Sequence, residues 1–256
     1  MATLSTGLYS WVNLCRNMLF PPACVFCRSP LSGQGVCCER CATDIRIWPH
    51  NHCLQCGRIL PAHLAPGPCG KCLQRAPPQL RTESLFIYRE GPVRNAILDW
   101  KLQGRDAGML WLSDAAEARL QTIFGQQSLL LPVPMPLSRM RRAGRHHAAD
   151  LCRAIADRTG AGFDWQLLRR NGEQQRQSSL SGRARWKNLC NAFSVDNDHW
   201  AEIVAGQASR DVSDMQIWVV DDIMTTGATM HYACRALRRA GIRAGAFTLT
   251  RLKDRA

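Results

Sequence analysis

Hydrophobic positions beyond residue 83 follow two alternating patterns along the chain. Short apolar runs typical of buried strands occur at 84–88, 129–133, 217–220 and 242–250. Between them, apolar residues recur at helical spacing over 92–102, about 106–124, 145–159 and 228–240. Strands that alternate with helices predict an α/β domain with a largely parallel sheet, and ligands of such sheets lie at the carboxyl ends of the strands.

Polar stretches of the sequence indicate loops, and they mark the boundaries between three segments of the chain. Residues 134–144 are expected to form a basic loop, and 197–213 a variable surface loop. Residues 1–20 predict an amphipathic helix that is too polar for a secretory signal. Residues 21–76 form a Cys-rich module that ends in a proline-rich linker, and the α/β domain spans 80–256.

The Cys-rich module contains four Cys-x-x-Cys pairs, separated by 10, 11 and 12 residues. Each pair can present two thiolates to one tetrahedral zinc ion, so two pairs complete a four-sulfur site. The candidate ligands are Cys24, Cys27, Cys38, Cys41, Cys53, Cys56, Cys69 and Cys72. They predict one or two structural zinc ions, bound either by sequential pairs or as an interleaved cross-brace.

Redox thiols and an iron–sulfur cluster are the competing interpretations of this module. Cys37 breaks the pair spacing and is interpreted as a spare thiol, and Cys15 as a small apolar residue of the amino-terminal helix. His50, His52 and His63 are expected to be surface or packing residues, because the cysteine pairs already supply both metal sites.

Charge and cysteine distribution restrict the partners and the compartment. The formal net charge is +13, which favours phosphates, nucleotides or nucleic acid as partners. No apolar run approaches the length of about 18 residues that a membrane-spanning helix needs, so no membrane insertion is expected. Clustered cysteines are typical of metal ligands in a reducing compartment, so we expect a cytoplasmic protein.

The strand at 217–220 leads into the most informative segment of the chain. Asp221 and Asp222 follow it, and residues 225–229 then enter a helix. Backbone N–H groups, hydroxyls and the helix dipole of such a turn can hold a phosphate dianion. The two carboxylates can accept hydrogen bonds from ribose hydroxyls or orient a hydrated Mg²⁺ ion. The segment therefore predicts a ribose 5-phosphate site; a plain strand–turn–helix with a capping threonine is the alternative.

Ile217–Thr229 resembles the 13-residue phosphoribosyl-diphosphate signature of type I phosphoribosyltransferases. It has four apolar, two acidic and two apolar residues, then two threonines and a glycine. Leu131–Pro136 and the arginines after it resemble the pyrophosphate loop of that fold. Gln177–Phe193 resembles a Gln-x-x-Leu, Arg-x-x-Asn, Ala-Phe element. Together with the cysteine module and Lys101–Leu102, these segments resemble the ComF family, and more narrowly its GntX-type DNA-utilisation branch.

This resemblance implies a double zinc ribbon followed by a type I phosphoribosyltransferase-like parallel sheet flanked by helices. It implies that Asp221 and Asp222 are the catalytic pair and that Mg²⁺ binds together with phosphoribosyl diphosphate. The 5-phosphate would be held by Thr225, Thr226, Gly227, Ala228 and Thr229, and the pyrophosphate by Arg139, Arg141 and Arg142. Where the family has Arg-Gly-Phe-Asn-Gln, this chain has Ala143–His147, which puts the details of pyrophosphate binding in question. His146 and His147 are expected to form a solvated helix start.

Two functions agree with these features, both in the uptake or use of DNA during natural competence, a role that the resemblance alone implies. One is an enzyme that binds phosphoribosyl diphosphate or a nucleotide and transfers the phosphoribosyl group to an unidentified acceptor. The other is a catalytically inactive single-stranded-DNA-binding protein that keeps the fold as a scaffold. Arg183, Arg185 and Lys187, beside Trp186, are the candidate DNA contacts, and a solvated basic face is the competing interpretation. Cytoplasmic DNA-uptake proteins are the implied partners.

Overall fold

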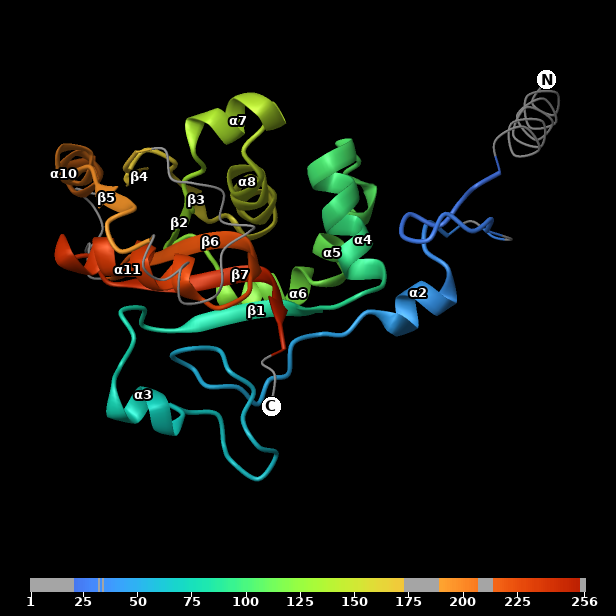
Figure 1. Cartoon of the computed structure of the whole chain (residues 1–256), viewed down its shortest axis with the longest axis horizontal. Coiled ribbons are helices and arrows are strands. Elements are labelled where there is room, and N and C mark those ends of the chain that lie inside the picture. Colours follow the sequence, from blue (N-terminus) through green and yellow to red (C-terminus); the bar gives the residue numbers. More distant parts are fainter. Residues whose placement is uncertain (1–20, 32, 34, 173–188, 207–213, 254–256) are drawn as a thin grey trace, which may run out of the picture. The chain divides into compact units, whose positions relative to one another are not determined.

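The computed structural model describes residues 21–31, 33, 35–172, 189–206 and 214–253. These residues form two compact units (Figure 1). The first unit contains the described residues up to Arg46 together with Arg89–Trp111. The second contains Ile47–Tyr88 and the described residues from Leu112 onward. The cysteine module is therefore shared between the units, with its first two pairs in one and its last two in the other. The helix expected at 1–20 lies outside the described residues.

A five-stranded parallel sheet forms the centre of the second unit and confirms the α/β fold class. Its order is β1-β7-β6-β2-β3. The strands are β1 (Thr82–Tyr88), β2 (Ser128–Pro132), β3 (Gly162–Phe163), β6 (Gln216–Met224) and β7 (Ala244–Leu252). Leu131, Val219 and Ala246 are fully buried between the sheet and its helices. Strands buried on both faces need continuous apolar runs, which is the pattern the sequence shows.

The path of the chain through this sheet places the ligand site. From β2 the chain passes through α8 (His147–Thr159) to β3, and from β6 through α11 (Ala228–Arg239) to β7. These crossovers run toward opposite edges of the sheet. Because both are right-handed by rule, α8 and α11 cover opposite faces (Figure 1). The order therefore reverses between β2 and β6, and such a switch point opens a crevice at the carboxyl ends of the two strands.

Three segments differ from the elements that the sequence predicts. Residues 134–144 contain a short helix, α7 (Leu137–Ala143), instead of a loop. Its residues are good helix formers, and Gly144 ends it with a φ of +68°. Much of the stretch expected as a surface loop is α10 (Asn197–Gly206), whose Trp200 and Ile203 pack against the core.

The single helix expected over 106–124 is divided into α5 (Ala107–Ala115) and α6 (Glu117–Ile123), because Ala116 leaves the helical conformation. Beyond β3, β4 (Leu168–Arg170) and β5 (Phe193–Val195) form a separate antiparallel pair. The sequence does not reveal the one-residue break at Ala116 or the three-residue strands β4 and β5, because features this short give too weak a periodic signal.

The first unit combines the first two cysteine pairs with α2 (Glu39–Asp44), α4 (Pro92–Leu98) and the π-helix η1 (Asp99–Gln103). The Phe26 ring meets the Trp111 ring edge-on, with centroids 5.4 Å apart. Arg28 donates to both carboxylate oxygens of Asp99 at 2.8 Å. These contacts attach the first cysteine cluster to the helices of its own unit.

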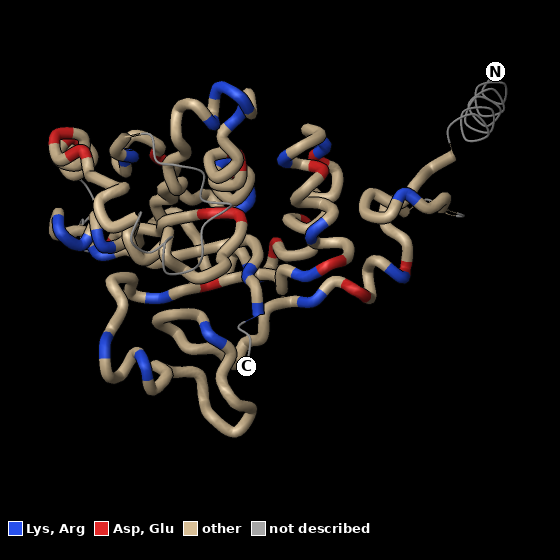
Figure 2. Tube along the Cα trace, in the orientation of Figure 1, with Lys and Arg blue, Asp and Glu red and all other residues tan. Residues whose placement is uncertain are grey.

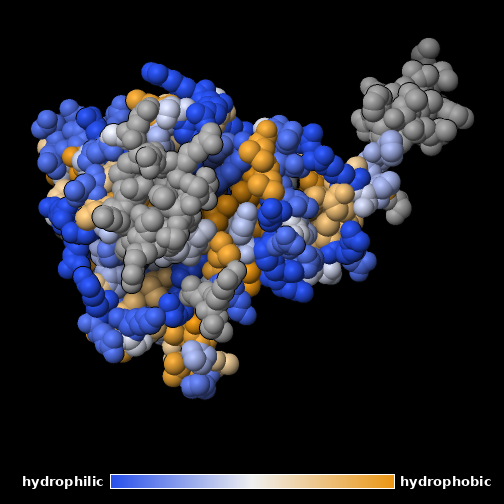
Figure 3. Space-filling view, in the orientation of Figure 1, coloured by the Kyte–Doolittle hydropathy of each residue, from blue (hydrophilic) through white to orange (hydrophobic). Residues whose placement is uncertain are grey.

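Charged and hydrophilic side chains cover most of the visible surface. Figure 2 shows Lys and Arg distributed over many elements, and Figure 3 shows a mainly hydrophilic face in the same orientation. Within the described ranges, no helix combines the length and apolar character that crossing a membrane requires.

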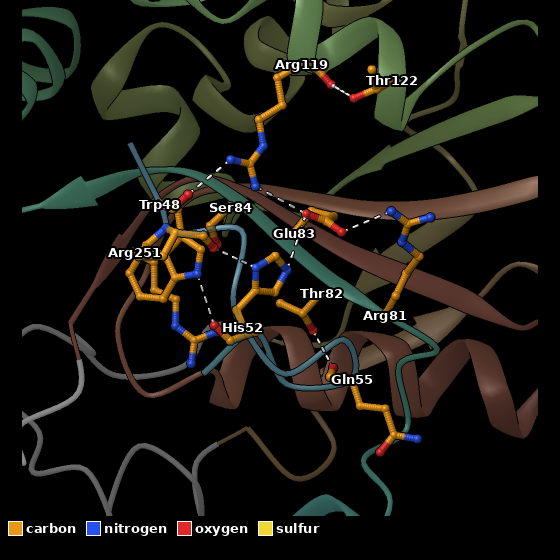
Figure 4. A network of polar contacts seen from close by, with 12 residues as sticks. Trp48, His52, Gln55, Arg81, Thr82, Glu83, Ser84, Arg119, Thr122 and Arg251 are labelled. Atoms are coloured by element: carbon orange, nitrogen blue, oxygen red, sulfur yellow. Dashed lines mark hydrogen bonds and ion pairs between the residues drawn. The ribbon is translucent and has the colours of Figure 1, made fainter. Parts of the chain in front are cut away.

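A buried polar network joins the last two cysteine pairs to β1 and β7 (Figure 4). The segment includes α3 (Gly70–Gln74). Glu83 on β1 lies 3.0 Å from Arg81, 3.6 Å from Arg119 and 3.6 Å from His52. Burial acts to raise the pKa of Glu83, but the contacts with His52 and Arg81 outweigh it and hold that pKa below its ordinary value. A buried carboxylate of this kind fixes the position of the segment, because removing its partners would leave an uncompensated charge.

Backbone carbonyls of the same segment accept further hydrogen bonds from the sheet. The Thr82 hydroxyl donates to the Gln55 carbonyl at 2.6 Å, and Arg251 donates to the Cys56 carbonyl. The indole N–H of Trp48 donates to the Gly57 carbonyl at 3.2 Å, and Trp48 is 1% exposed. The second cysteine cluster thus lies directly on the sheet.

Replacing Gly57 with alanine is expected to weaken this attachment strongly. Gly57 has a φ of +70°, and a Cβ there would lie 2.5 Å from Arg251 Nη1 and 2.9 Å from Thr82 Cγ2. We expect the free energy of unfolding to fall by about 2–4 kcal/mol, from left-handed strain plus overpacking. Urea unfolding followed by circular dichroism measures it. Gly241→Ala is the matched control, because its φ is +79° but no atom lies within 4 Å. Equal losses for the two variants would show that the close approach is unimportant.

Candidate functional site

The acidic pair lies within β6 rather than after it. The sequence places the end of the strand at Val220, whereas β6 continues to Met224 by pairing Ile223 with Thr250 of β7. Asp222 is 7% exposed, and Asp221 is half-buried. Successive side chains of a strand point to opposite faces, so the two carboxylates leave the strand in different directions. The backbone N–H of Asp222 donates to Asp221 Oδ1 at 2.9 Å, which orients the Asp221 carboxylate.

The turn after β6 exposes the amino terminus of α11 at the edge of the sheet. Thr225 and Thr226 are exposed, and Gly227 adopts a φ of +75° as the residue before the helix. The backbone N–H of Ala228 donates to Thr226 Oγ1 at 3.4 Å. N–H groups in the first turn of a helix have no partner inside the helix, and the helix dipole adds positive potential there. The turn therefore presents hydroxyls and backbone donors of the kind that an anion can accept.

The loop after β2 begins beside Val220 of β6. The backbone N–H of Val133 donates to the Val220 carbonyl at 2.8 Å, so the contact between the two strands extends to their carboxyl ends. The loop then leads into α7, which contains the exposed residues Arg139, Arg141 and Arg142. The structure thus brings the basic segment and the acidic pair to the same switch point.

Arg170 of β4 is a further candidate residue for this site, one that the sequence does not predict. Burial lowers the pKa of Arg170, the charge of Arg139 lowers it further, and the charge of Asp221 opposes both. Arg170 therefore lies within electrostatic reach of Arg139 and Asp221. Its guanidinium stands over the Phe193 ring, 5.4 Å from the centroid, which fixes its direction. No local sequence signal reveals this position, because it depends on the pairing of Leu168–Arg170 with the Phe193 strand.

Of the three predicted pyrophosphate arginines, Arg139 is the one whose charge acts on the pKa of Arg170. Arg141 and Arg142 lie on the same short helix and are exposed. The DNA-binding candidates Arg183, Arg185 and Lys187 lie outside the described residues.

A cavity of about 570 Å³ is lined by the loop after β2, by α7 and by the segment around β4. Apolar and aromatic side chains form most of its wall, among them Met135, Met140, Trp165 and Leu168, and Arg170 belongs to the same wall. Trp165 is 62% exposed, so a flat apolar face is accessible there. A cavity of this size and lining can accept a planar ring.

The two histidines at the start of α8 have structural positions. His146 Nδ1 accepts from the backbone N–H of Ala149 at 3.1 Å and caps the helix. Burial lowers the pKa of His146, so the ring is neutral near pH 7. His147 is 6% exposed, so this helix start is buried there rather than solvated as the sequence suggested.

The eight predicted metal ligands form two separate groups. Cys24, Cys27, Cys38 and Cys41 make one group, and Cys53, Cys56, Cys69 and Cys72 the other, with the sulfur atoms of each group within 4.8 Å of one another. Sequential pairs therefore share a site, and the cross-brace is excluded. Cys37 belongs to neither group, as expected for a spare thiol.

Both groups have the local structure of thiolate metal sites. The backbone N–H of Cys38 points at Cys24 Sγ (3.4 Å), and that of Cys69 points at Cys53 Sγ (3.1 Å), which stabilises thiolates. The core of the second group consists of Cys53, Leu60 and Cys72, so most of its apolar contacts come from the ligands themselves. Four sulfur donors at this separation fit a tetrahedral zinc ion, and a closed four-sulfur site has a structural role.

Comparison with known proteins agrees with both parts. Residues 15–73 match the model of the double zinc ribbon domain, and residues 169–254 match that of the phosphoribosyl transferase domain. The DNA utilization protein YhgH of Salmonella typhi is 31% identical over 228 residues, which cover 86% of this chain and 92% of that protein.

More distant relatives match a similar share of the chain. Competence protein F of Haemophilus influenzae is 25% identical over 226 residues, covering 86% of this chain and 92% of its own. Competence protein ComFC of Bacillus subtilis is 24% identical over 221 residues, covering 84% of this chain and 83% of its own. The chain therefore belongs to the ComF/YhgH family, in which a double zinc ribbon is combined with a phosphoribosyltransferase domain.

Proposed function

We propose that the site at the ends of β2 and β6 binds phosphoribosyl diphosphate with Mg²⁺, or a nucleotide with the same ribose 5-phosphate. The protein would use this ligand in the uptake or utilisation of DNA, since its relatives are named as a DNA utilization protein and a competence protein. One observation supports the proposal above all others. Asp221 and Asp222 lie at the carboxyl end of β6 just before the amino terminus of α11, and the charges of Asp221 and Arg139 both act on the buried Arg170.

Each part of the ligand has a partner of suitable chemistry. The 5-phosphate would accept hydrogen bonds from the hydroxyls and N–H groups of residues 225–229. Asp221 and Asp222 would accept hydrogen bonds from the two ribose hydroxyls. Arg139 and Arg170 would neutralise the diphosphate, because a planar guanidinium matches phosphate oxygens. When bound, Mg²⁺ would supply further charge neutralisation on the diphosphate.

The same placement suits transfer of the phosphoribosyl group. Departure of diphosphate from C1 of the ribose builds positive charge on the ring and negative charge on the leaving group. Asp221 would stabilise the first charge, and Arg139 and Arg170 the second. The apolar cavity beside Arg170 would hold the acceptor, with Trp165 and Met140 against its ring. Positioning and charge stabilisation suffice for this reaction, and no covalent nucleophile is needed.

Calorimetric titration of the zinc-loaded protein tests the proposal. We expect saturable binding of Mg²⁺–phosphoribosyl diphosphate, one molecule per chain, and weaker binding of ribose 5-phosphate alone. Absence of binding by both ligands, with single-stranded DNA still bound, would refute the proposal and favour the scaffold function.

Replacing Arg170 with glutamine is expected to weaken the binding of phosphoribosyl diphosphate by about 10- to 150-fold, since a charge-assisted hydrogen bond contributes about 1.5–3 kcal/mol. Ribose 5-phosphate, which lacks the diphosphate, should lose little affinity. Arg153→Gln is the matched control, because Arg153 is an exposed residue of α8 that does not line the cavity. Calorimetry with both ligands checks this. Equal losses for the two ligands, or for the two variants, would exclude a role of Arg170 at the diphosphate.

A further inference from the structure

A second pocket, lined mainly by arginines, lies along the carboxyl-terminal part of α11. It has a volume of about 500 Å³ and is lined by Arg75, Ala76, Pro78, His231, Arg235, Arg238 and Arg239. We call it the arginine pocket. Its α11 residues begin three residues beyond Ala228, and Arg235–Arg239 lie about 10–17 Å along the helix axis from that first residue. The arginine pocket is therefore distinct from the site at the carboxyl ends of β2 and β6.

Two separate segments build this pocket. On α11, positions 231, 235, 238 and 239 follow the spacing of one helix face, while Ala233, Cys234 and Leu237 on the other face are buried in the core. Arg75 comes from the chain just after α3, beside the second cysteine group. The His231 ring lies between the two segments. Burial lowers its pKa, and the nearby charges of Arg235 and Arg75 lower it further. His231 is therefore neutral near pH 7.

The arginines of this pocket have no acidic counterpart among the described residues. No carboxylate forms an ion pair there with Arg75, Arg235, Arg238 or Arg239, whereas arginines elsewhere, such as Arg145 and Arg158, pair with aspartates. Figure 2 shows Lys and Arg, in blue, on the end of α11 at the left of the view, and Figure 3 shows a hydrophilic surface on that side. Four like charges that converge on one hollow repel one another, so an anion from outside the chain would stabilise them.

We propose that the arginine pocket is a binding site for the phosphodiester backbone of single-stranded nucleic acid. The positive groups are spread over about one turn of α11, from Arg235 to Arg239, and continue onto Arg75 of a separate segment, which matches a chain of phosphates better than one compact phosphate. The pocket is open and its flank is formed by Pro78, Ala76 and the neutral His231 ring, against which a base can stack. A hydrophilic surface of this kind does not suit an apolar protein partner.

Fluorescence anisotropy with a labelled single-stranded oligothymidylate tests this proposal on the full-length, zinc-loaded chain. The variant is Arg75→Gln/Arg238→Gln/Arg239→Gln, since all three side chains are exposed and come from both walls. The control is Arg40→Gln/Arg105→Gln/Arg153→Gln, which removes the same charge from exposed positions elsewhere. We expect the pocket variant to lose affinity about tenfold or more and its salt slope to fall by about 2, at 0.7 per phosphate contact.

The control variant should lose far less affinity for the oligothymidylate than the pocket variant. The conservative variant Arg75→Lys/Arg238→Lys/Arg239→Lys should retain most of the wild-type affinity, because lysine also neutralises a phosphate as a point charge. Equal losses of affinity in the pocket and control variants would overturn the proposal, because the binding would then depend only on the net charge of the protein. A pocket variant that binds the oligothymidylate normally but no longer binds inorganic pyrophosphate would also overturn it, in favour of a small phosphate ligand. The pocket variant should bind Mg²⁺–phosphoribosyl diphosphate like the wild type, so this test is independent of the proposed function.

Discussion

Replacing Cys72 with serine is expected to reduce the zinc content from two ions to one ion per chain. Cys72 is buried, with 6% of its surface exposed, and its group has a core made mainly of its own ligands. Without the metal, little apolar contact remains to hold this segment together, so loss of zinc is also loss of local structure. Elemental analysis by mass spectrometry measures the zinc content. The total tryptophan fluorescence should change as well, because Trp48, one of eight tryptophans, donates to the Gly57 carbonyl of the same segment.

Cys37→Ser is the control for this prediction. Cys37 neighbours a ligand in sequence but belongs to neither sulfur group, and burial raises the pKa of its thiol to about 11. It should keep both zinc ions. Two zinc ions in the Cys72 variant, or equal losses in both variants, would contradict the assignment of the ligands.

The double substitution Asp221→Asn/Asp222→Asn is expected to weaken the binding of Mg²⁺–phosphoribosyl diphosphate at least about 100-fold. Hydrogen bonds to each charged carboxylate contribute about 1.5–3 kcal/mol, and both are lost together. Asparagine has nearly the same volume as aspartate, so the packing around the buried Asp222 should persist. Calorimetry gives the affinity, and thermal unfolding checks that the variant is folded.

A matched variant separates this effect from a change of net charge. Asp157→Asn/Asp198→Asn removes two exposed carboxylates of helices α8 and α10. It should bind like the wild type. If the two double variants bind equally well, the acidic pair does not contact the ligand.

Strong local patterns made much of the fold predictable. Mainly apolar runs marked β2, β6 and β7, because most side chains of a strand that is covered on both faces are buried. The regular cysteine pairs indicated four-sulfur sites, and the segment after Val220 indicated an anion-binding turn. The predictions of the fold class and of the family are therefore confirmed, and both rest on residues that lie close together in the sequence.

The remaining features depend on contacts between distant segments. β6 extends beyond Val220 because β7 continues to pair with it, and no residue near Asp221 indicates this. Arg170 reaches the site only because β4 pairs with a strand more than twenty residues later. The sequential grouping of the cysteines and their distribution over two units likewise depend on which surface each pair packs against.

A crystal structure of the protein with Mg²⁺–phosphoribosyl diphosphate would test the central claim most directly. We predict density for the 5-phosphate at residues 225–229, for the ribose hydroxyls at Asp221 and Asp222, and for the diphosphate beside Arg139 and Arg170. A ligand bound at any other place, or a site at β2 and β6 that stays empty at saturating ligand, would contradict the account.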